Sequence, residues 1–371
     1  KTIGIFGGGQ LGRMMAQAAL PLNIQCSFFE AETDCPAAIL GPVFSSKDPQ
    51  ALQAFIASAE VFSLEFENTP VADVDVLTQT KTLHPPRLAL ATAQNRLAEK
   101  GLFDELAIPV APYRAVDSLE SLKQAVAELG LPIVLKTVTG GYDGKGQFVL
   151  RSEDQIDTAW AELGPAKSLI AESFVKFSRE VSIIAVRGQD GDVKTWALAE
   201  NHHHNGILSH SIVPAPNSTD LQPVAQDYIT RLLNHLNYVG VLTLELFVTE
   251  QGLYANEMAC RVHNSGHWSI EGAICSQFEN HIRAVAGLPL GATDVVRPTV
   301  MVNIIGQHPK SEDVLALKGA HLHLYNKSER AGRKLGHITL MPNNSDELTD
   351  LCRQLAQILP VPLALTTDMN I

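Results

Sequence analysis

The sequence predicts an α/β protein of three parts, and three observations support this fold class. Apolar strands alternate with amphipathic helices over residues 1–87, which is typical of a parallel, doubly wound sheet of the Rossmann-like kind. A glycine-rich loop lies between two strands at residues 139–147, inside a central part expected to span 88–294. Two glutamates sit among apolar residues in a presumed hairpin at 240–257. Residues 295–371 are expected to form a small C-terminal unit.

The composition excludes several classes of protein. With 371 residues and 45% hydrophobic content, the chain is long enough for two or three domains. A net charge of -12 without a run of Lys and Arg argues against a nucleic-acid partner. Five scattered cysteines fit reduced thiols in the cytoplasm better than a disulfide framework. No signal peptide and no apolar run long enough to span a bilayer is seen, so we expect no membrane partner.

The individual elements follow from apolar periodicity and from turn residues. Pro85-Pro86 ends the first part, and one helix is expected over residues 88–106. A further helix is expected after residue 9, and another is expected to end at residue 163. The remaining expected helices span residues 119–129, 222–236 and 346–359. The expected strands are 2–6, 24–29, 43–44, 61–64, 132–135, 147–150, 168–171, 180–186, 194–198, 240–248, 253–257, 300–304, 321–324 and 338–341.

The motif Gly7-x-Gly9-x-x-Gly12 follows the first strand, and Glu30 ends the second. This is the layout of a dinucleotide-binding site. The same geometry serves any phosphate-bearing ligand at a helix N-terminus, and a packing role for the turn also stays open. An NAD-dependent oxidoreductase is therefore one alternative function.

The glycine-rich loop at residues 139–147 predicts a flap over a nucleotide. Its glycines let backbone N–H groups approach an anion, and Lys136 and Lys145 add positive charge at its rims. It is not a Walker A motif, because Gly146 follows Lys145 and a strand follows the loop. A plain hairpin turn is the alternative.

Glu245 and Glu257 predict a magnesium site. Carboxylates in a buried hairpin are costly unless they are paired or coordinated. Beside Asn256 they offer the hard oxygen ligands that suit Mg²⁺ when it bridges nucleotide phosphates. Two salt-bridged strand residues facing solvent are the alternative.

Cys260, His263 and His267 have a spacing that superficially suggests zinc. The intervening Asn264-Ser265-Gly266 breaks the helix that such a site needs, and no fourth ligand is evident. We favour an anion-binding loop in which Arg261, His263 and Asn264 donate to a substrate, with an ordinary structured turn left open.

Two further clusters of charged or polar residues are candidates. Adjacent residues on a strand face opposite sides, so at most alternate members of His202-His203-His204 share a site. The most basic local patch binds a phosphate or carboxylates, or is a solvated surface; it comprises Lys327, Arg330, Arg333 and Lys334.

Together these motifs resemble the ATP-grasp fold and, within it, the 5-(carboxyamino)imidazole ribonucleotide synthases of purine biosynthesis. The similarity runs over nearly the whole chain. The segments that carry it are Gly9-Gln10-Leu11-Gly12-Arg13-Met14, residues 141–147, Asn256-Glu257 and the most specific one, His263-Asn264-Ser265-Gly266-His267-Trp268.

The resemblance implies a carbon–nitrogen ligase with Mg²⁺ as cofactor, and a homodimer. MgATP would phosphorylate bicarbonate to carboxyphosphate. The exocyclic amine of 5-aminoimidazole ribonucleotide would then be carboxylated, giving ADP and phosphate. An acyl phosphate of bicarbonate is short-lived in water, so the site must close.

The resemblance also implies roles for individual residues. ATP would be bound by Arg96, Lys136, Gly141, Tyr142, Asp143, Gly144, Lys145, Gly146, Gln147, the adenine hinge Glu172, Ser173, Phe174 and Val175, the ribose-binding Glu180, His203, Asn256 and Glu257. Mg²⁺ would be held by Glu245 and Glu257. The ribonucleotide and bicarbonate side would be lined by Tyr142, Asp143, Lys145, Arg261, His263, Asn264, Lys327 and Arg333.

Three residues receive catalytic roles. Asp143 is assigned as proton acceptor for the attacking amine, and Arg261 and Lys327 as stabilisers of developing carboxylate charge. The chain departs from the family where Cys260 and Ala331 replace common prolines, which concerns local loop geometry. The rival within the same fold is a formate-using glycinamide ribonucleotide transformylase, which shares the nucleotide half. A non-catalytic nucleotide-binding module is a further rival, disfavoured by the two carboxylates.

Overall fold

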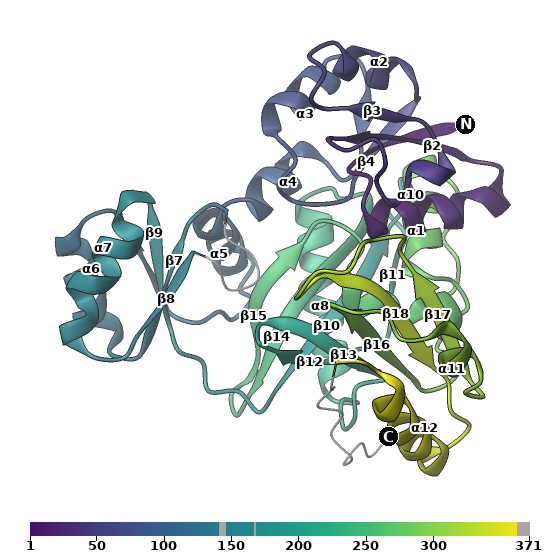
Figure 1. The fold of residues 1–371 in the computed structure, drawn as a ribbon. Helices are drawn as coiled ribbons and strands as arrows, with labels where there is room; N and C mark the ends of the chain where they lie inside the picture. Colours follow the sequence, from purple (N-terminus) through teal and green to yellow (C-terminus); the bar gives the residue numbers. More distant parts are fainter. Residues whose placement is uncertain (141–145, 167, 362–371) are drawn as a thin grey trace.

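The computed structural model describes residues 1–140, 146–166 and 168–361 (Figure 1). Its first sheet is wholly parallel, with the strand order β3-β2-β1-β4-β5, and this confirms the doubly wound sheet. The strands are β1 (Thr2–Phe6), β2 (Gln25–Glu30), β3 (Val43–Ser45), β4 (Val61–Leu64) and β5 (Thr82–Leu83). Their helices are α1 (Gln10–Ala19), α2 (Ala51–Ala57) and α3 (Val71–Leu77). Strand order reverses between β1 and β4, where ligands of such sheets bind at the carboxyl ends.

Two helices occupy the segment where the sequence predicted one helix over 88–106. They are α4 (Arg87–Ala93) and α5 (Arg96–Glu105). Asn95 between them has extended backbone, and its side chain accepts a hydrogen bond from Ala98 N at 3.0 Å. Asn95 is thus an N-cap that starts a new helix, because its oxygen satisfies an otherwise unpaired N–H group.

A small antiparallel sheet with two helices forms a lobe that stands apart from the rest of the molecule (Figure 1). Its strand order is β6-β9-β7-β8, and the helices cover the sheet with a separate core that includes Leu122, Leu135 and Leu150. The elements are β6 (Tyr113–Val116), α6 (Leu119–Leu129), β7 (Ile133–Thr137), β8 (Gln147–Leu150), α7 (Ile156–Leu163) and β9 (Leu169–Ser173). The predicted flap connects β7 to β8, an antiparallel pair.

A large antiparallel sheet forms the body of the protein, in the order β15-β14-β10-β12-β13-β16-β18-β17 with β11 beside β10. Its strands are β10 (Arg179–Arg187), β11 (Val193–Thr195), β12 (Ala199–His204), β13 (Ile207–Val213), β14 (Gly240–Thr249), β15 (Gly252–Ala259), β16 (Thr299–Ile305), β17 (Ala320–Leu324) and β18 (Lys334–Leu340). The hairpin of β14 and β15 was predicted, whereas that of β12 and β13 was not. The last three strands extend the body sheet through β13, so the separateness of unit 295–371 stays a prediction.

The remaining helices are α8 (Leu221–His235), α9 (Ser269–Gly272), α10 (Gln277–Ala286), α11 (Ser311–Leu315) and α12 (Ser345–Ile358). Helix α10 joins the first sheet to the body. His281 is fully buried, its Nε2 lies 2.7 Å from Ser63 Oγ of β4, and its Nδ1 accepts from Val241 N of β14 at 3.0 Å. Within the described ranges, no helix has the length and apolar content that crossing a membrane would require.

Candidate functional site

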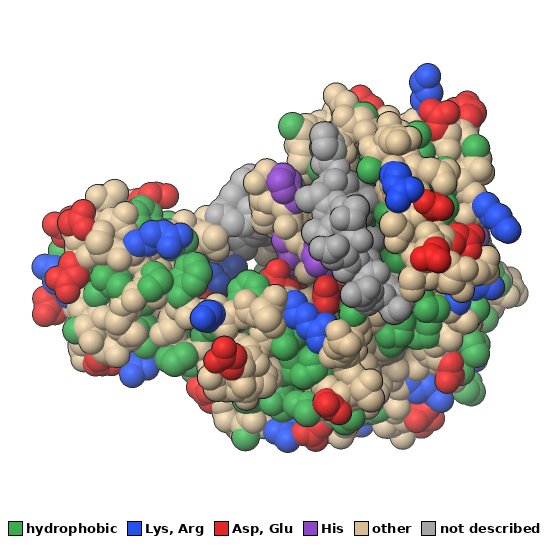
Figure 2. Space-filling model, turned by 90° about the horizontal axis from the view of Figure 1, so that it is seen from below, with side chains coloured by type: hydrophobic (Ala, Val, Ile, Leu, Met, Phe, Trp, Pro, Cys, Tyr) green, Lys and Arg blue, Asp and Glu red, His purple; other side chains and the backbone are tan. Residues whose placement is uncertain are grey.

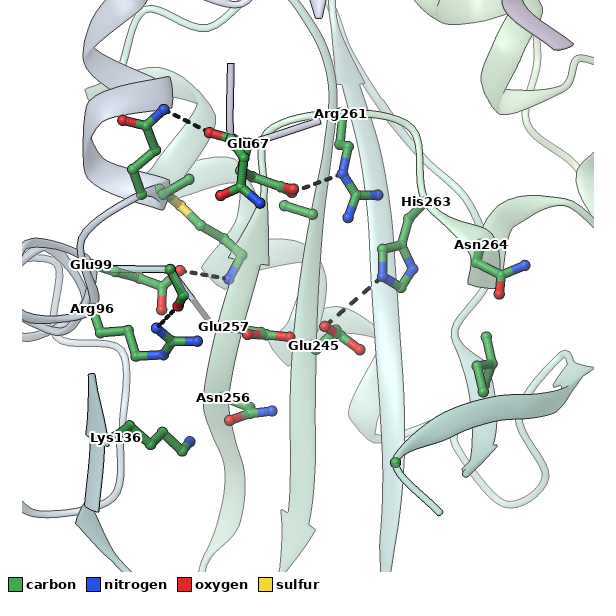
Figure 3. A pocket seen from close by; sticks show the side chains of 18 of the residues that line it. Glu67, Arg96, Glu99, Lys136, Glu245, Asn256, Glu257, Arg261, His263 and Asn264 are labelled. Carbon is green, nitrogen blue, oxygen red and sulfur yellow. Dashed lines mark hydrogen bonds and ion pairs between the residues drawn. The ribbon is translucent and has the colours of Figure 1, made fainter. Parts of the chain in front are cut away.

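A cavity of about 390 Å³ lies where the small lobe, helix α5 and the body sheet meet (Figure 3). Figure 2 shows acidic, basic and histidine side chains gathered around the hollow between the small lobe and the rest. A second cavity, of about 320 Å³, adjoins the first and is lined by the glycine-rich turn of the first sheet. Both are lined by Arg261, His263, Asn264 and Lys334, so these four residues stand between the two cavities.

The two predicted metal-binding glutamates face each other across the body sheet. Glu245 of β14 pairs with Glu257 of β15, and the register shifts immediately after this pair, where Leu246 pairs with Ala255. Asn256 is the extra residue of this β-bulge. Neighbouring strand residues normally face opposite sides, but the bulge lets both Asn256 and Glu257 line the cavity (Figure 3).

This arrangement fits Mg²⁺. Burial and the neighbouring Glu257 carboxyl raise the pKa of Glu245 well above its usual value, and a cation bound here would favour the charged form of Glu245. Among the described residues, no group of three or more His, Cys, Asp or Glu side chains is placed to hold a metal by itself. Two carboxylates completed by nucleotide phosphates and water match the way Mg²⁺ is usually bound.

Lys136 and Glu172 form a buried ion pair at the edge of the small lobe. Lys136 Nζ lies 2.6 Å from Glu172 Oε2, and Lys100 Nζ lies 3.2 Å from Glu172 Oε1. Burial alone would raise the pKa of Glu172, but the two lysines hold it below its usual value. The Glu172 carboxylate is therefore committed to lysines, and the predicted adenine contact would fall to the backbone of this segment.

The other predicted hinge and ribose residues lie around this edge. Ser173 ends β9 and donates its N–H to Pro112 O, and Phe174 is 48% exposed. Ser173, Phe174 and Val175 do not line the first cavity. Glu180 Oε2 lies 3.0 Å from His203 Nδ1, and His203 lines the cavity while His202 binds Glu200 instead.

Arg96 fixes the base of the predicted flap. At the start of α5 its guanidinium donates to Thr137 O at 2.9 Å and to Gly140 O at 2.7 Å, and it lines the cavity. Gly146 has φ of +70°, and Gln147 lines the cavity. The remaining flap predictions lie outside the described residues: Gly141, Tyr142, Asp143, Gly144 and Lys145.

The predicted anion-binding loop lies on the wall between the two cavities. Arg261 Nε lies 2.8 Å from Glu67 Oε1, and its Nη1 donates to Val262 O at 3.0 Å. Asn264 and Asn303 exchange two amide hydrogen bonds, of 3.0 and 2.7 Å. His263 Nε2 lies 3.9 Å from Glu245 Oε2. All three predicted residues thus line the cavity that Glu245 and Glu257 also line.

Of the two predicted site residues in the basic patch, Lys327 contacts Gln10 of the second cavity, whereas Arg333 lines neither cavity. Lys327 Nζ donates to Gln10 Oε1 at 3.1 Å, and burial together with Arg333 lowers the pKa of Lys327 to about 8. Arg333 itself donates to Ser328 O at 3.0 Å. Lys334 of the same patch lines both cavities, although it was not among the predicted site residues.

The glycine-rich turn already holds a carboxylate of the protein. Gly9 N donates to Glu65 Oε2 at 2.8 Å, and Gly8 N donates to Glu30 Oε2 at 3.0 Å. A Cβ at Gly7 or Gly9 would lie 2.3 or 2.4 Å from a Glu65 carboxylate oxygen, so glycine is required here. Because Glu65 takes the place of a phosphate, the dinucleotide alternative loses its anion site.

Sequence reasoning missed several residues of the site. Glu65 and Glu67 directly follow the apolar strand β4, and charged residues at the carboxyl end of a parallel strand were a usable signal. Glu99 lines the cavity and accepts from Met258 N at 3.0 Å, and burial raises its pKa to about 8. Glu99 and Lys100 lie on a helix whose contacts are distant in sequence, so no local pattern marked them.

Three protein-family matches together span most of the chain. Residues 1–94 match the ribonucleotide synthetase preATP-grasp domain, residues 101–278 the ATP-grasp domain, and residues 299–350 the phosphoribosylaminoimidazole carboxylase C-terminal domain. The N5-carboxyaminoimidazole ribonucleotide synthase of Pseudomonas aeruginosa is 46% identical over 340 residues, which covers 91% of this chain and 94% of that protein.

Solved structures agree with these matches. The crystal structure of N5-carboxyaminoimidazole ribonucleotide synthetase from Thermus thermophilus has a TM-score of 0.92 and 44% identity, covering 97% of this chain and 99% of that one. The N5-carboxyaminoimidazole synthase of Aspergillus clavatus, in complex with ADP and 5-aminoimidazole ribonucleotide, has a TM-score of 0.87 and 29% identity, covering 96% and 99%.

Proposed function

The chain belongs to the N5-carboxyaminoimidazole ribonucleotide synthase family, and on this premise we propose that its two cavities unite ATP, bicarbonate and 5-aminoimidazole ribonucleotide in one carboxylation. The chain is an ATP-grasp ligase of purine biosynthesis that converts 5-aminoimidazole ribonucleotide to its N5-carboxyamino derivative at the expense of ATP. Bicarbonate as the carboxyl source and carboxyphosphate as the intermediate are parts of the proposal.

The observation that carries the proposal is the wall shared by the two cavities. On one side lie Lys136 and the carboxylate pair, which suit a nucleotide with its metal. On the other side lies the carboxyl edge of the first sheet, with Lys334 reaching both cavities. An intermediate made from ATP in the first cavity can therefore meet an acceptor from the second without leaving the protein, as a water-sensitive acyl phosphate requires.

Mg²⁺ would be held by Glu245 and Glu257, and it would neutralise charge on the phosphates during phosphoryl transfer. Lys136 supports the phosphates from the small lobe, with Arg96 holding the flap base beside it. Bicarbonate oxygen attacks the γ-phosphorus and ADP leaves. Arg261, fixed by Glu67, offers positive charge to the resulting acyl phosphate.

The second step joins nitrogen to carbon. The exocyclic amine attacks the carboxyl carbon, the bond from that carbon to the phosphate oxygen breaks, and phosphate leaves. The amine loses one proton, and we propose Asp143, which lies outside the described residues, as its acceptor. Lys327, held by Gln10, supplies positive charge on the side of the second cavity.

The proposal includes a cytoplasmic homodimer. All five cysteines lie in the described ranges, where they are buried and unpaired, and this supports a reducing compartment. The dimer rests on the family resemblance and is tested by the molecular mass in solution. Sedimentation at the mass of one chain would contradict it.

The experiment that tests the function measures phosphate release from ATP. We expect release that requires both bicarbonate and 5-aminoimidazole ribonucleotide for its full rate, together with a carboxylated ribonucleotide seen by mass spectrometry. Isotopic label from ¹³C-bicarbonate should appear in that product. Phosphate release that does not respond to the ribonucleotide would exclude the proposed reaction. So would a product that takes up ¹³C from labelled formate and none from labelled bicarbonate.

A further inference from the structure

A row of buried polar side chains crosses the body sheet beside the carboxylate pair. Ser182 of β10 is the direct cross-strand partner of Glu245, and Asn201 of β12 is the partner of Ser211 of β13. Residues paired across strands, and those two apart on one strand, share a face, so all of these side chains lie on the face that carries Glu245. Ser182 is 1% exposed, Asn201 5% and Ser211 0%.

The row ends at the ring of His263. Ser265, which is fully buried in the short 3₁₀ turn Asn264–Gly266, has its Oγ 2.8 Å from Ser182 Oγ and 2.7 Å from His263 Nδ1. Asn201 Nδ2 lies 3.0 Å from Ser182 Oγ, and Ser211 Oγ lies 2.7 Å from Asn201 Oδ1. Four hydrogen bonds in series therefore connect the interior of the sheet to a ring that lines both cavities.

The direction of these hydrogen bonds follows from one fixed donor. The backbone N–H of Ser265 points to His263 Nδ1 at 3.2 Å, and because a backbone N–H only donates, Nδ1 must be an acceptor without a proton. The Ser265 hydroxyl beside it then also donates to Nδ1. Having used its single proton, Ser265 Oγ must accept from Ser182.

The same reasoning orients the rest of the row. Ser182 has given its proton to Ser265, so it accepts from the amide nitrogen of Asn201. The amide oxygen of Asn201 is then left to accept from Ser211. Every donor points toward His263, and every group in the row is satisfied, which is what buried polar groups require.

We propose that Ser265 and Ser182 are positioning residues, which hold His263 as the tautomer protonated on Nε2. The Nε2–H of His263 then donates to an anionic oxygen of the bicarbonate-derived intermediate. The unprotonated nitrogen, Nδ1, faces Ser265 instead, so it does not act as a base toward the ligand. Its Nε2 faces Glu245 Oε2 at 3.9 Å, too far for a hydrogen bond, so the N–H remains available to a ligand. This role rests on the proposed function, whereas the tautomer itself does not.

The first test reads the tautomer without any substrate. Long-range ¹H–¹⁵N spectra of histidine-labelled protein distinguish a protonated ring nitrogen from an unprotonated one, and loss of a signal in His263→Gln assigns it. We expect a protonated Nε2 and an unprotonated Nδ1 at neutral pH. A protonated Nδ1 would overturn the proposal, even if the enzyme proved to carry out the proposed carboxylation.

The second test separates a donor from a base. A glutamine amide N–H can stand in for the Nε2–H of histidine but cannot accept a proton. We expect His263→Gln to keep kcat within about tenfold of the parent, and His263→Ala to lose about 100-fold or more. Equal losses in the two variants would show that a basic nitrogen is needed.

The third test asks whether the serines act through His263. Ser265→Ala and Ser182→Ala should each lower kcat by up to about tenfold with KM for ATP little changed, and much less in a His263→Gln background. Ser27→Ala is the matched control, because Ser27 of β2 is also fully buried and its Oγ lies 2.8 Å from Ser58 Oγ, at the end of helix α2. Equal losses in both backgrounds, or an equal loss in the control, would reduce the serines to structural residues.

Discussion

Replacing Glu172 by glutamine tests the buried ion pair of the small lobe. The carboxylate lies 2.6 Å from Lys136 Nζ and 3.2 Å from Lys100 Nζ, and the side chains of Glu172 and Lys100 are only 8% and 3% exposed. The amide keeps the shape but leaves the Lys100 charge with a neutral partner, Asn256 O at 2.8 Å. Removing one member of a buried pair costs about 3–5 kcal/mol. Because Lys136 is 22% exposed and keeps some contact with water, we expect the lower end, about 3 kcal/mol.

The assay is urea unfolding followed by circular dichroism and by proteolysis within the small lobe. Glu128→Gln is the matched control, because Glu128 pairs with Arg114 in the same lobe but both side chains are exposed. We expect no measurable change in the control, since exposed pairs contribute little.

The pH dependence of the stability difference between parent and Glu172→Gln is a second test of the ion pair. The pKa of Glu172 lies below its usual value, so its stabilisation is present at neutral pH and is lost as pH falls through the lowered pKa. The difference between parent and Glu172→Gln should therefore be constant between about pH 6 and 8 and should shrink below about pH 4.5. A variant as stable as the parent at pH 7, or a difference that grows in acid, would refute the reasoning.

Three further changes are predicted. Glu245→Gln should weaken the apparent affinity for Mg²⁺ at least about tenfold in the phosphate-release assay. Glu250→Gln in the neighbouring turn is the control and should leave this affinity unchanged. If Glu245→Gln needed no more Mg²⁺ than the parent, Glu245 would not be a metal ligand. Burial lowers the pKa of His281 to about 3. Between about pH 6.5 and 3 this histidine therefore binds a proton only in the unfolded chain. As the pH is lowered through this range, the free energy of unfolding should decrease by up to about 1.4 kcal/mol per pH unit because of His281. His281→Asn should flatten that acid slope in urea unfolding, and a slope equal to the parent's would contradict the assignment. Asn303→Leu removes the amide pair of Asn264 and should lower kcat/KM for the ribonucleotide about tenfold with KM for ATP unchanged; an equal rise in KM for ATP would point to general damage.

Local patterns predicted those parts of the fold in which one face or one turn decides the structure. The strand Thr2–Phe6 and the helix Leu119–Leu129 have the predicted bounds, because their apolar periodicity and caps act within a few residues. The hairpin carrying Glu245 and Glu257 was predicted for the same reason. The hairpin Ala199–His204 with Ile207–Val213 was missed, because its three successive histidines resemble a polar loop, and only backbone pairing with the neighbouring strands makes this segment a strand.

The remainder depends on contacts between segments far apart in sequence. Lys100 precedes Glu172 by 72 residues and Asn256 by 156, and only the folded chain brings them together. Glu65 looked like the end of a strand, and nothing local showed that its carboxylate would fill the glycine turn. The site residues assigned by resemblance remain predictions, although those in the described ranges lie in or beside the two cavities in most cases.

The bulge at Asn256 also sets a counting rule for strand β15. Strand β14 has four steps between Thr249 and Glu245, whereas β15 has five between Gly252 and Glu257, and Asn256 is the additional residue. Loss of one residue in this stretch would restore ordinary pairing and keep Glu257 opposite Glu245, but it would remove the bulge that lets two successive residues of β15 line the cavity. The exposed turn at residues 250–252 can vary in composition, but the length of the strand that follows it is fixed by the bulge, and homologous chains should show substitutions here without insertions or deletions.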